Sequence, residues 1–210
     1  MKNFNNIVKE LRGLRCFTVL WITQSLSALG SAMTNFALII WLYGENGSAA
    51  ETAMLSVCSY APYVAVSIFA GALIDKWNKK AVMLVCDAFA ALCTAAVLVL
   101  LTTDRLRPYH LYVLNTLNSL MNTIQQPASE VAVTALVPKK HFQRIGAMKA
   151  FSNSLIGIFA PVLSSAILAF WHMSAVIAFD LASCFVAEAA LLFFVKIPRT
   201  DSSKSSQSIL

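Results

Sequence analysis

The stretch Gly71-Ala-Leu-Ile-Asp75-Lys76-Trp-Asn-Lys79-Lys80-Ala-Val-Met83 separates two long apolar runs, Ala53–Ile74 and Ala81–Leu101. It places one acid and three lysines within six residues. A run of about 20 apolar residues is long enough to cross the hydrocarbon core of a membrane. The stretch is therefore typical of a short charged loop between two transmembrane helices.

The composition of the whole chain agrees with a membrane protein. Hydrophobic residues make up 58% of the 210 residues and charged residues 12%, whereas soluble chains have about 45–50% and about 25%. A soluble domain of this size would need more charge to cover its surface. The same composition excludes a disordered chain, a secreted disulfide scaffold and a nucleic-acid-binding module, because each needs polar or cysteine-rich sequence.

Outward from the loop, the chain divides into six apolar runs of about 20 residues or slightly more, each of spanning length. They are Phe17–Tyr43, Ala53–Ile74, Ala81–Leu101, Tyr109–Glu130, Met148–Phe170 and Ser174–Val195. We expect an all-α fold: a cytoplasmic segment 1–16, a six-helix transmembrane domain 17–198 and a polar cytoplasmic tail 199–210. Two three-helix units, about 17–101 and 109–195, would form an inverted repeat of the kind that transporters use.

The basic residues predict the orientation of these spans. With six spans both termini lie on one side of the membrane, and that side holds fourteen of the sixteen lysines and arginines. They are Lys2, Lys9, Arg12, Arg15, Lys76, Lys79, Lys80, Lys139, Lys140, Arg144, Lys149, Lys196, Arg199 and Lys204. The positive-inside rule puts this side in the cytoplasm, so the net charge of +6 needs no nucleic-acid partner. The first run lacks a cleavage pattern and is expected to remain as the first helix.

No residues form a recognisable catalytic or metal-binding pattern. The five cysteines lie within spans or at a cytoplasmic span end, as small hydrophobic residues of a helix bundle do. His110, His141 and His172 lie in loops or at span ends, and no GxxxxGK[ST] loop is present. We therefore expect no enzyme activity, no metal and no cofactor.

Polar residues form stripes along two of the spans. In 109–130 and 17–43 they recur at steps of three and four residues, which places them on one helix face. They are Asn115, Asn118, Ser119, Asn122, Gln125, Gln126 and Ser129 in the one, and Gln24, Ser27, Ser31 and Thr34, with Asn35 alongside, in the other. Single residues of this kind often bond helices together, whereas a full-length stripe favours a water-filled path or a substrate cavity. Of these, Ser119, Ser129 and Asn35 are not assigned to the cavity.

Four acids lie within the spans. Asp87 and Glu130 are near cytoplasmic ends, where we expect capping or pairing with loop lysines and arginines. Asp180 and Glu188 lie deeper in the last span. Desolvation disfavours the charged form of a carboxyl group, which suits such a group to carrying a proton. These two are the candidates for proton coupling.

Two prolines interrupt the spans at corresponding places in the two units. Pro62 and Pro161 each follow an alanine. Proline removes a backbone donor and kinks a helix.

The loop 71–83 resembles the cytoplasmic loop signature of the major facilitator superfamily, G-x-L-a-D-r-x-G-r-[KR]-x-x-[LI]. The matching positions are Gly71, Leu73, Asp75, Lys76, Lys79 and Lys80. Asn78 replaces the second glycine, and asparagine also tolerates a left-handed turn. Met83 stands where Leu or Ile is usual. The resemblance implies a gating loop in which Gly71 allows close helix approach, Asp75 caps or pairs at a helix end and the lysines stay in the cytoplasm.

Further segments resemble the macrolide-efflux and enterobactin-exporter branch of that family. They are Gln125-Gln-Pro127-Ala-Ser-Glu130, Leu136-Val-Pro138-Lys-Lys140, Gly157-Ile-Phe-Ala160-Pro161-Val-Leu-Ser164-Ser165, Ile-Ala-Phe-Asp180 and Lys196-Ile-Pro198. The third departs from the antiporter pattern G-x-x-x-G-P-x-x-G-G in having Ala160, Ser164 and Ser165 at its glycines. The span 109–130 lacks the arginine of many proton-driven members.

The resemblance covers about Leu14 to Pro198 and implies the amino-terminal six-helix half of a twelve-helix fold. It implies a multi-pass protein of the bacterial cell membrane that exports an amphipathic small molecule, a macrolide-like drug or a siderophore, by proton-coupled alternating access. The partners would be the substrate, the lipid bilayer, and a carboxy-terminal half or a second copy. The alternative is a truncated or half-size protein without transport activity of its own. A small channel is disfavoured because no filter motif is present.

Overall fold

The computed structural model describes residues 2–74, 77–137 and 141–193, with side chains for 16–45, 47–67, 77–133, 137 and 141–193. This part of the chain forms six α-helices and no strands, which confirms the all-α prediction for it. The helices are α1 (Lys2–Asn46), α2 (Ala49–Ile74), α3 (Lys79–Thr102), α4 (Pro108–Leu136), α5 (Phe142–Phe170) and α6 (Met173–Phe193).

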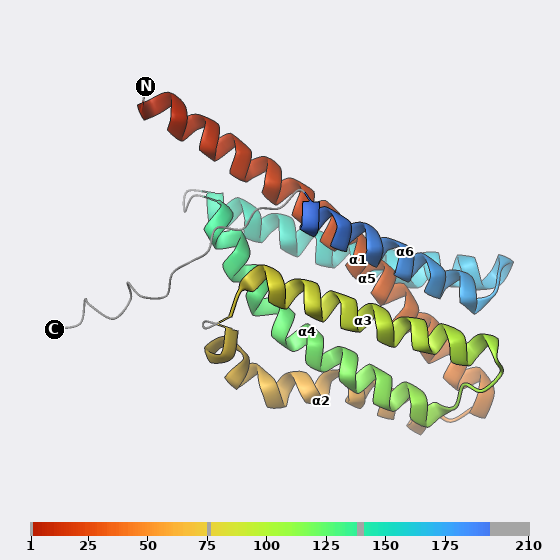
Figure 1. Ribbon diagram of the computed structural model, residues 1–210. Helices are drawn as coiled ribbons and strands as arrows, with labels where there is room; N and C mark the ends of the chain where they lie inside the picture. The colour runs from red at the N-terminus through yellow and green to blue at the C-terminus, as the bar shows by residue number, and fades with distance from the viewer. Residues whose placement is uncertain (1, 75–76, 138–140, 194–210) are drawn as a thin grey trace.

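Successive helices run in opposite directions, so the start of α1 and the end of α6 lie at the same end of the bundle (Figure 1). The N-terminal turns of α1, in red, project beyond the other helices. The most extensive contacts join α2 with α4, α1 with α6, α3 with α4, α1 with α5 and α3 with α6. By contrast α1 and α4 touch only sparsely, which leaves space between them.

The turns between the helices follow from their residues. Gly47, the first residue after α1, has a φ of +62°, and Asp104, between α3 and α4, has a φ of +52°. Asn78 has an extended backbone, with a φ of −71°, and its side chain accepts a hydrogen bond from Lys80 N at 3.1 Å. Asn78 therefore does not adopt the left-handed conformation that asparagine tolerates. An N-cap residue needs the extended conformation to satisfy a free N–H of the first turn.

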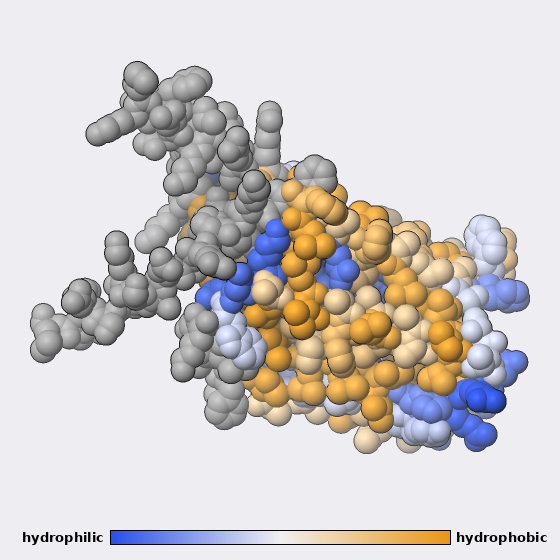
Figure 2. Space-filling view, in the orientation of Figure 1, coloured by the Kyte–Doolittle hydropathy of each residue, from blue (hydrophilic) through white to orange (hydrophobic). Residues whose placement is uncertain are grey.

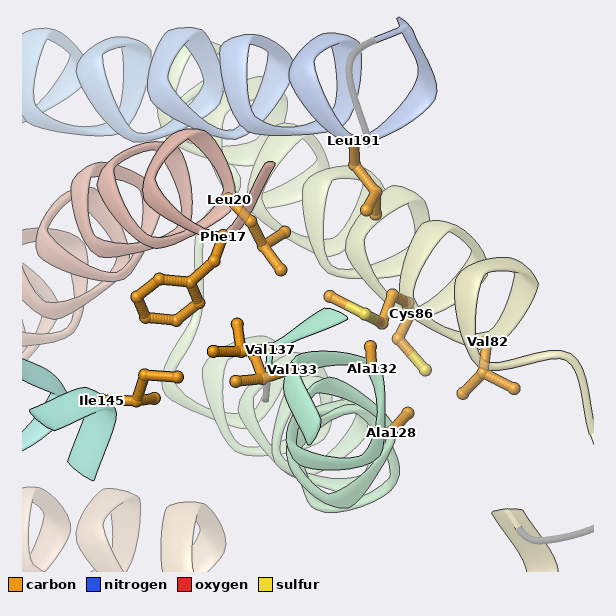
Figure 3. Packing of buried hydrophobic residues seen from close by; sticks show 11 residues of the cluster. Phe17, Leu20, Val82, Cys86, Ala128, Ala132, Val133, Val137, Ile145 and Leu191 are labelled. Carbon is orange, nitrogen blue, oxygen red and sulfur yellow. The ribbon is translucent and has the colours of Figure 1, made fainter. Parts of the chain in front are cut away.

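Two apolar clusters hold the bundle together, one toward each end. Figure 3 shows the cluster near the start of α1, where Leu20 lies over Val133 of α4 and the ring of Phe17 lies on the side of Ile145 of α5, with Leu191 of α6 above them. The second cluster lies toward the opposite end. Its residues are Met33, Ala37, Leu38, Leu42, Leu55, Val97, Leu111, Ala160, Met173, Val176 and Ile177. Small residues in both clusters, such as Ala132 and Ala160, let the helices approach closely.

The outer surface is largely apolar. On the face in Figure 2, hydrophobic residues form a broad band, and hydrophilic residues gather mainly at the right-hand end of the described part. Large apolar side chains such as Phe170 and Phe185 are 82% and 73% exposed. Monomeric soluble proteins rarely expose apolar patches of this extent, so this face is suited to lipid.

By length and composition, four helical segments of the described part can cross a membrane. They are Cys16–Glu45, Lys79–Thr102, Phe142–Phe170 and Met173–Phe193. Four of the six predicted spans therefore meet this criterion. The other two helices, α2 and α4, have 26 and 29 residues and so are also of spanning length. The polar stripe lowers the hydropathy of α4, and part of the apolar run of α2 has no described side chains.

Candidate functional site

A cavity of about 370 Å³ opens between α1, α4 and α5, toward the end of the bundle where α1 begins. Its wall combines apolar side chains with amides, hydroxyls and two charged groups. The lining residues are Phe17, Leu20, Trp21, Gln24, Ser25, Ala28, Asn122, Gln125, Gln126, Ser129, Glu130, Val133, Lys149, Ser152, Asn153 and Ile156. Such a mixture of apolar surface and a few polar groups is typical of small-molecule sites.

A second cavity of about 340 Å³ lies between α1, α2 and α4. Its residues are Asn35, Ser59, Tyr60, Tyr63, Asn115, Asn118, Ser119, Asn122 and Gln126. Asn122 and Gln126 line both cavities, so the polar face of α4 passes from one into the other. Asn122 Nδ2 donates a hydrogen bond of 3.4 Å to Asn118 Oδ1 along this face.

The wall of the first cavity is bonded to a buried acid of α3. Asp87 is 7% exposed, and its two carboxylate oxygens accept hydrogen bonds from different helices. Gln24 Nε2 of α1 donates to Oδ2 at 3.3 Å, and Gln125 Nε2 of α4 donates to Oδ1. Within the described residues no lysine, arginine or histidine pairs with Asp87. The expected capping or pairing with loop cations is therefore not what the structure shows, because the side chain turns into the bundle.

A second acid lies near Asp87. Glu188 of α6 is close enough to interact with it electrostatically. Among the described residues, Glu188 Oε1 and the indole Nε1 of Trp21 are buried without a hydrogen-bond partner. Trp21 lines the cavity one helical turn before Gln24. Buried polar atoms without partners are uncommon in native structures. A third such atom, Thr34 Oγ1, belongs to the pocket beside Asp180.

Asp180 occupies a different place, in the contact between α1 and α6. It is 3% exposed, and its Oδ1 accepts a hydrogen bond of 2.9 Å from Ser31 Oγ. With Thr34, Asn35, Asn115 and other residues it lines a pocket of only about 30 Å³, which is the space of roughly one water molecule. Asp180 does not line either of the two larger cavities.

The polar stripe of α1 divides between these two environments. Gln24 lines the first cavity, whereas Ser31 and Thr34 line the small pocket beside Asp180. Ser27 is 9% exposed and interacts with Cys184 of α6. The later part of the α1 stripe, from Ser27 to Thr34, therefore takes part in contacts between helices.

The stripe of α4 also makes helix contacts at one end. Asn115 Nδ2 donates to Ser59 Oγ at 2.6 Å and to Leu55 O at 3.4 Å, and Ser119 Oγ donates to Ser59 O. Farther along α4, the side chains of Asn122, Gln125 and Gln126 border the first cavity. One helix face therefore serves both packing and the cavity.

The residues of the predicted gating loop are described in part. Asp75 and Lys76 lie outside the described residues, and the backbone of Gly71 belongs to α2. Lys79 begins α3. Lys80 Nζ donates a hydrogen bond of 3.0 Å to Leu192 O in the last turn of α6, which ties the loop to a neighbouring helix end.

Both prolines lie inside helices, Pro62 in α2 and Pro161 in α5. Next to Pro161, Ala160 is 2% exposed, and Ser164 Oγ donates a hydrogen bond of 3.0 Å to Met33 O of α1. The small residues in place of the antiporter glycines therefore still allow close packing of α5 on α1.

Sequence reasoning missed Asp87 as a member of the site, together with Lys149 and Asn153 from α5. Lys149 is eight residues after His141 and looks like a loop cation, yet it lines the same cavity as Glu130. For Asp87, a signal was present: it is the seventh residue of the apolar run Ala81–Leu101, too far from the loop for a simple cap. Within the described residues, no three side chains of His, Cys, Asp or Glu cluster as metal ligands.

The comparisons with known proteins identify the class. The family model of the Major Facilitator Superfamily matches residues 20–209, so the chain belongs to this family. Together with its apolar helices, this makes it a multi-pass bacterial membrane protein. No solved structure is a significant match to the chain.

Among curated relatives, the chain is similar to macrolide efflux protein A of Streptococcus pyogenes, with 23% identity over 87% of this chain and 45% of that protein. Macrolide efflux protein A of Enterococcus faecalis is 22% identical over 73% of this chain and 47% of its own length. An uncharacterised MFS-type transporter of Bacillus subtilis, YfiS, is 23% identical over 88% and 43%. The chain thus spans about half the length of these relatives.

Proposed function

We propose that the chain is the amino-terminal half of a secondary active transporter that exports an amphipathic small molecule by alternating access. The observation that carries this proposal is the cavity of about 370 Å³ between α1, α4 and α5, with its mixed apolar and amide wall. The names of two relatives support a macrolide-like drug as substrate, and a siderophore is the other class that the sequence favours. All six helices would span the membrane, with both termini in the cytoplasm.

The gating loop and the substrate residues belong to the same proposal. Lys80, bonded to the end of α6, supports a loop that joins cytoplasmic helix ends, and Gly71, Asp75, Lys76 and Lys79 would complete it. Of the predicted substrate residues, four line the first cavity: Gln24, Asn122, Gln125 and Gln126. Asn115 and Asn118 line the second cavity, and Ser27, Ser31 and Thr34 would support α1 against α6.

The alternative is a half-size protein that has no transport activity of its own, or that acts only as a dimer or with a second half. It is favoured by one observation, the share of 43–47% that the chain covers in its relatives. Asn122 and Gln126 are exposed, and exposed amides in a membrane are costly unless protein or water covers them. A partner opposite α1 and α4 would provide this cover.

The first experiment is to determine the DNA sequence that follows codon 210 and to express the complete reading frame. In a macrolide-sensitive bacterium, the protein is expected to lower the accumulation of labelled erythromycin. Asn122→Leu and Gln24→Leu should each reduce this efflux severalfold without lowering the amount of membrane protein. Gln143→Leu is the matched control, because Gln143 is exposed at the start of α5 and lines neither cavity. Parallel loss of protein and efflux would instead assign Asn122 and Gln24 to packing.

Proton coupling through a buried acid is the second part of the proposal. Asp180→Asn and Glu188→Gln are each expected to abolish transport that is driven by a pH gradient across vesicles, since neither variant side chain can take up and release the proton. Binding of the same labelled drug should persist. Unchanged transport in either variant removes that acid from the coupling mechanism.

A further inference from the structure

Asp87 is bonded to the cavity only through neutral groups. Its carboxylate accepts one hydrogen bond from Gln24 and one from Gln125, and both glutamines line the cavity wall while Asp87 lies behind them. Three helices, α1, α3 and α4, therefore meet at one carboxyl group. A salt bridge would hold the carboxylate ionised, whereas two amides leave it free to gain a proton.

The protonation state of Asp87 determines how both amides must point. An ionised carboxylate only accepts hydrogen bonds, so Gln24 and Gln125 turn their NH₂ groups toward it and leave their carbonyl oxygens for the cavity. A protonated carboxyl group carries an O–H donor and needs an acceptor. One amide must then turn its carbonyl oxygen to Asp87, and its NH₂ group faces the cavity instead.

We propose that Asp87 is a protonation site that sets which hydrogen-bonding groups Gln24 and Gln125 offer to a ligand in the cavity. In its link to transport this inference rests on the proposed function. The ionised state presents two carbonyl acceptors, which suit a ligand rich in hydroxyl groups or carrying a protonated amine. Proton uptake replaces one acceptor by a donor and weakens the binding of that ligand. Proton uptake by Asp87 and ligand binding in the cavity therefore disfavour each other, although the proton and the ligand bind to different atoms. Export of a ligand in exchange for a proton requires such competition.

The groups around Asp87 fit this role. From α6, Glu188 interacts with it electrostatically and Cys184 Sγ lies 3.9 Å from its backbone oxygen. On α3 itself Cys86 is the neighbouring titratable group. Two charged groups, Glu130 on α4 and Lys149 on α5, line the same cavity as the two amides. A second acid beside Asp87 disfavours the loss of both protons, because two like charges in a low dielectric repel.

The test is an infrared pH titration of the complete protein in lipid, which follows the carbonyl band of protonated carboxyl groups. Asp87→Asn should remove one titrating band, whereas Asp180→Asn should leave that band in place. Gln24→Leu and Gln125→Leu should each move its midpoint to higher pH by on the order of one unit, because each amide bonds the ionised form more strongly. Gln126→Leu is the matched control: Gln126 lines the same cavity but does not bond Asp87.

Two results would overturn the inference: a titration unchanged by Asp87→Asn, or a midpoint that neither Gln24→Leu nor Gln125→Leu moves. If Asp87→Asn does not fold, the band is assigned with isotope-labelled aspartate, and the glutamine variants decide the question. Erythromycin, which carries hydroxyl groups and an amine, should shift the wild-type midpoint to lower pH. A protein that shows the Asp87 band but no erythromycin effect retains the protonation site and contradicts the proposed macrolide substrate.

Discussion

At the scale of single residues, Gly30 lies at a close approach between α1 and α6. A Cβ atom at this position would lie 2.5 Å from Ser183 Oγ and 2.9 Å from Asp180 Cα. The second atom belongs to the backbone of α6 and cannot move aside alone. The absence of a side chain at Gly30 therefore allows Ser31, the next residue, to reach the buried carboxylate of Asp180.

Gly30→Ala is expected to destabilise the bundle by about 1–3 kcal/mol, the usual cost of overpacking a filled interior. The measurement is the thermal unfolding midpoint of the complete protein in detergent. Gly146→Ala in α5 is the control, because a Cβ there meets no atom within 4 Å, and alanine favours a helix by about 1 kcal/mol over glycine. Equal midpoints for the two variants would show that α1 and α6 can separate without cost.

At the scale of helices, α4 does two kinds of work with one polar face. Its early residues bond to α2 through Asn115 and Ser119, beside the second cavity, and its later residues border the first cavity. The difference comes from the neighbour: α2 packs closely against α4, whereas α1 touches it only sparsely. Amide side chains that face a closely packed helix form hydrogen bonds to it, whereas those that face a cavity remain available to a ligand.

Asn115→Leu should therefore lower the amount of folded protein, by loss of its bonds to Ser59 and Leu55. Side-chain hydrogen bonds between membrane helices contribute about 1 kcal/mol each or less, so a fall of the unfolding midpoint is expected rather than complete loss. Asn122→Leu, two turns later, should leave the midpoint unchanged. The reverse order of effects would mean that Asn122, and not Asn115, holds α4 against a neighbouring helix.

The sequence was sufficient for the helices and for four polar residues of the first cavity wall. Apolar length predicted all six helices, and the three-and-four spacing placed Gln24, Asn122 and Gln126 on faces that line a cavity. The spacing could not separate cavity from contact for Ser27 and Ser31, because which helix stands opposite depends on tertiary packing. Asp87 was misplaced for the same reason: its bonds to α1 and α4 span 63 and 38 residues of sequence.

At the scale of the whole molecule, the five most extensive contacts between helices map onto one another when α1, α2 and α3 are exchanged with α4, α5 and α6. The pair α2 and α4 becomes α5 and α1, the pair α1 and α6 becomes α4 and α3, and the pair α3 and α6 is unchanged. Two three-helix units of opposite orientation would produce this pattern. Pro62 and Pro161 then lie in the equivalent helices α2 and α5.

Such units fix which loops share a side of the membrane. The connections after α1, α3 and α5 would lie outside, and they contain Arg105 and Arg107 as their only lysines or arginines in the sequence. We expect alkaline phosphatase, which is active only outside the cytoplasm, to be active when fused after Gly47 or Thr103 and inactive after Asn78 or Phe193. A fluorescent protein that folds only in the cytoplasm should show the opposite pattern. Phosphatase activity after Phe193 would require an odd number of spans. Two three-helix units of opposite orientation would then be ruled out, because they need six spans.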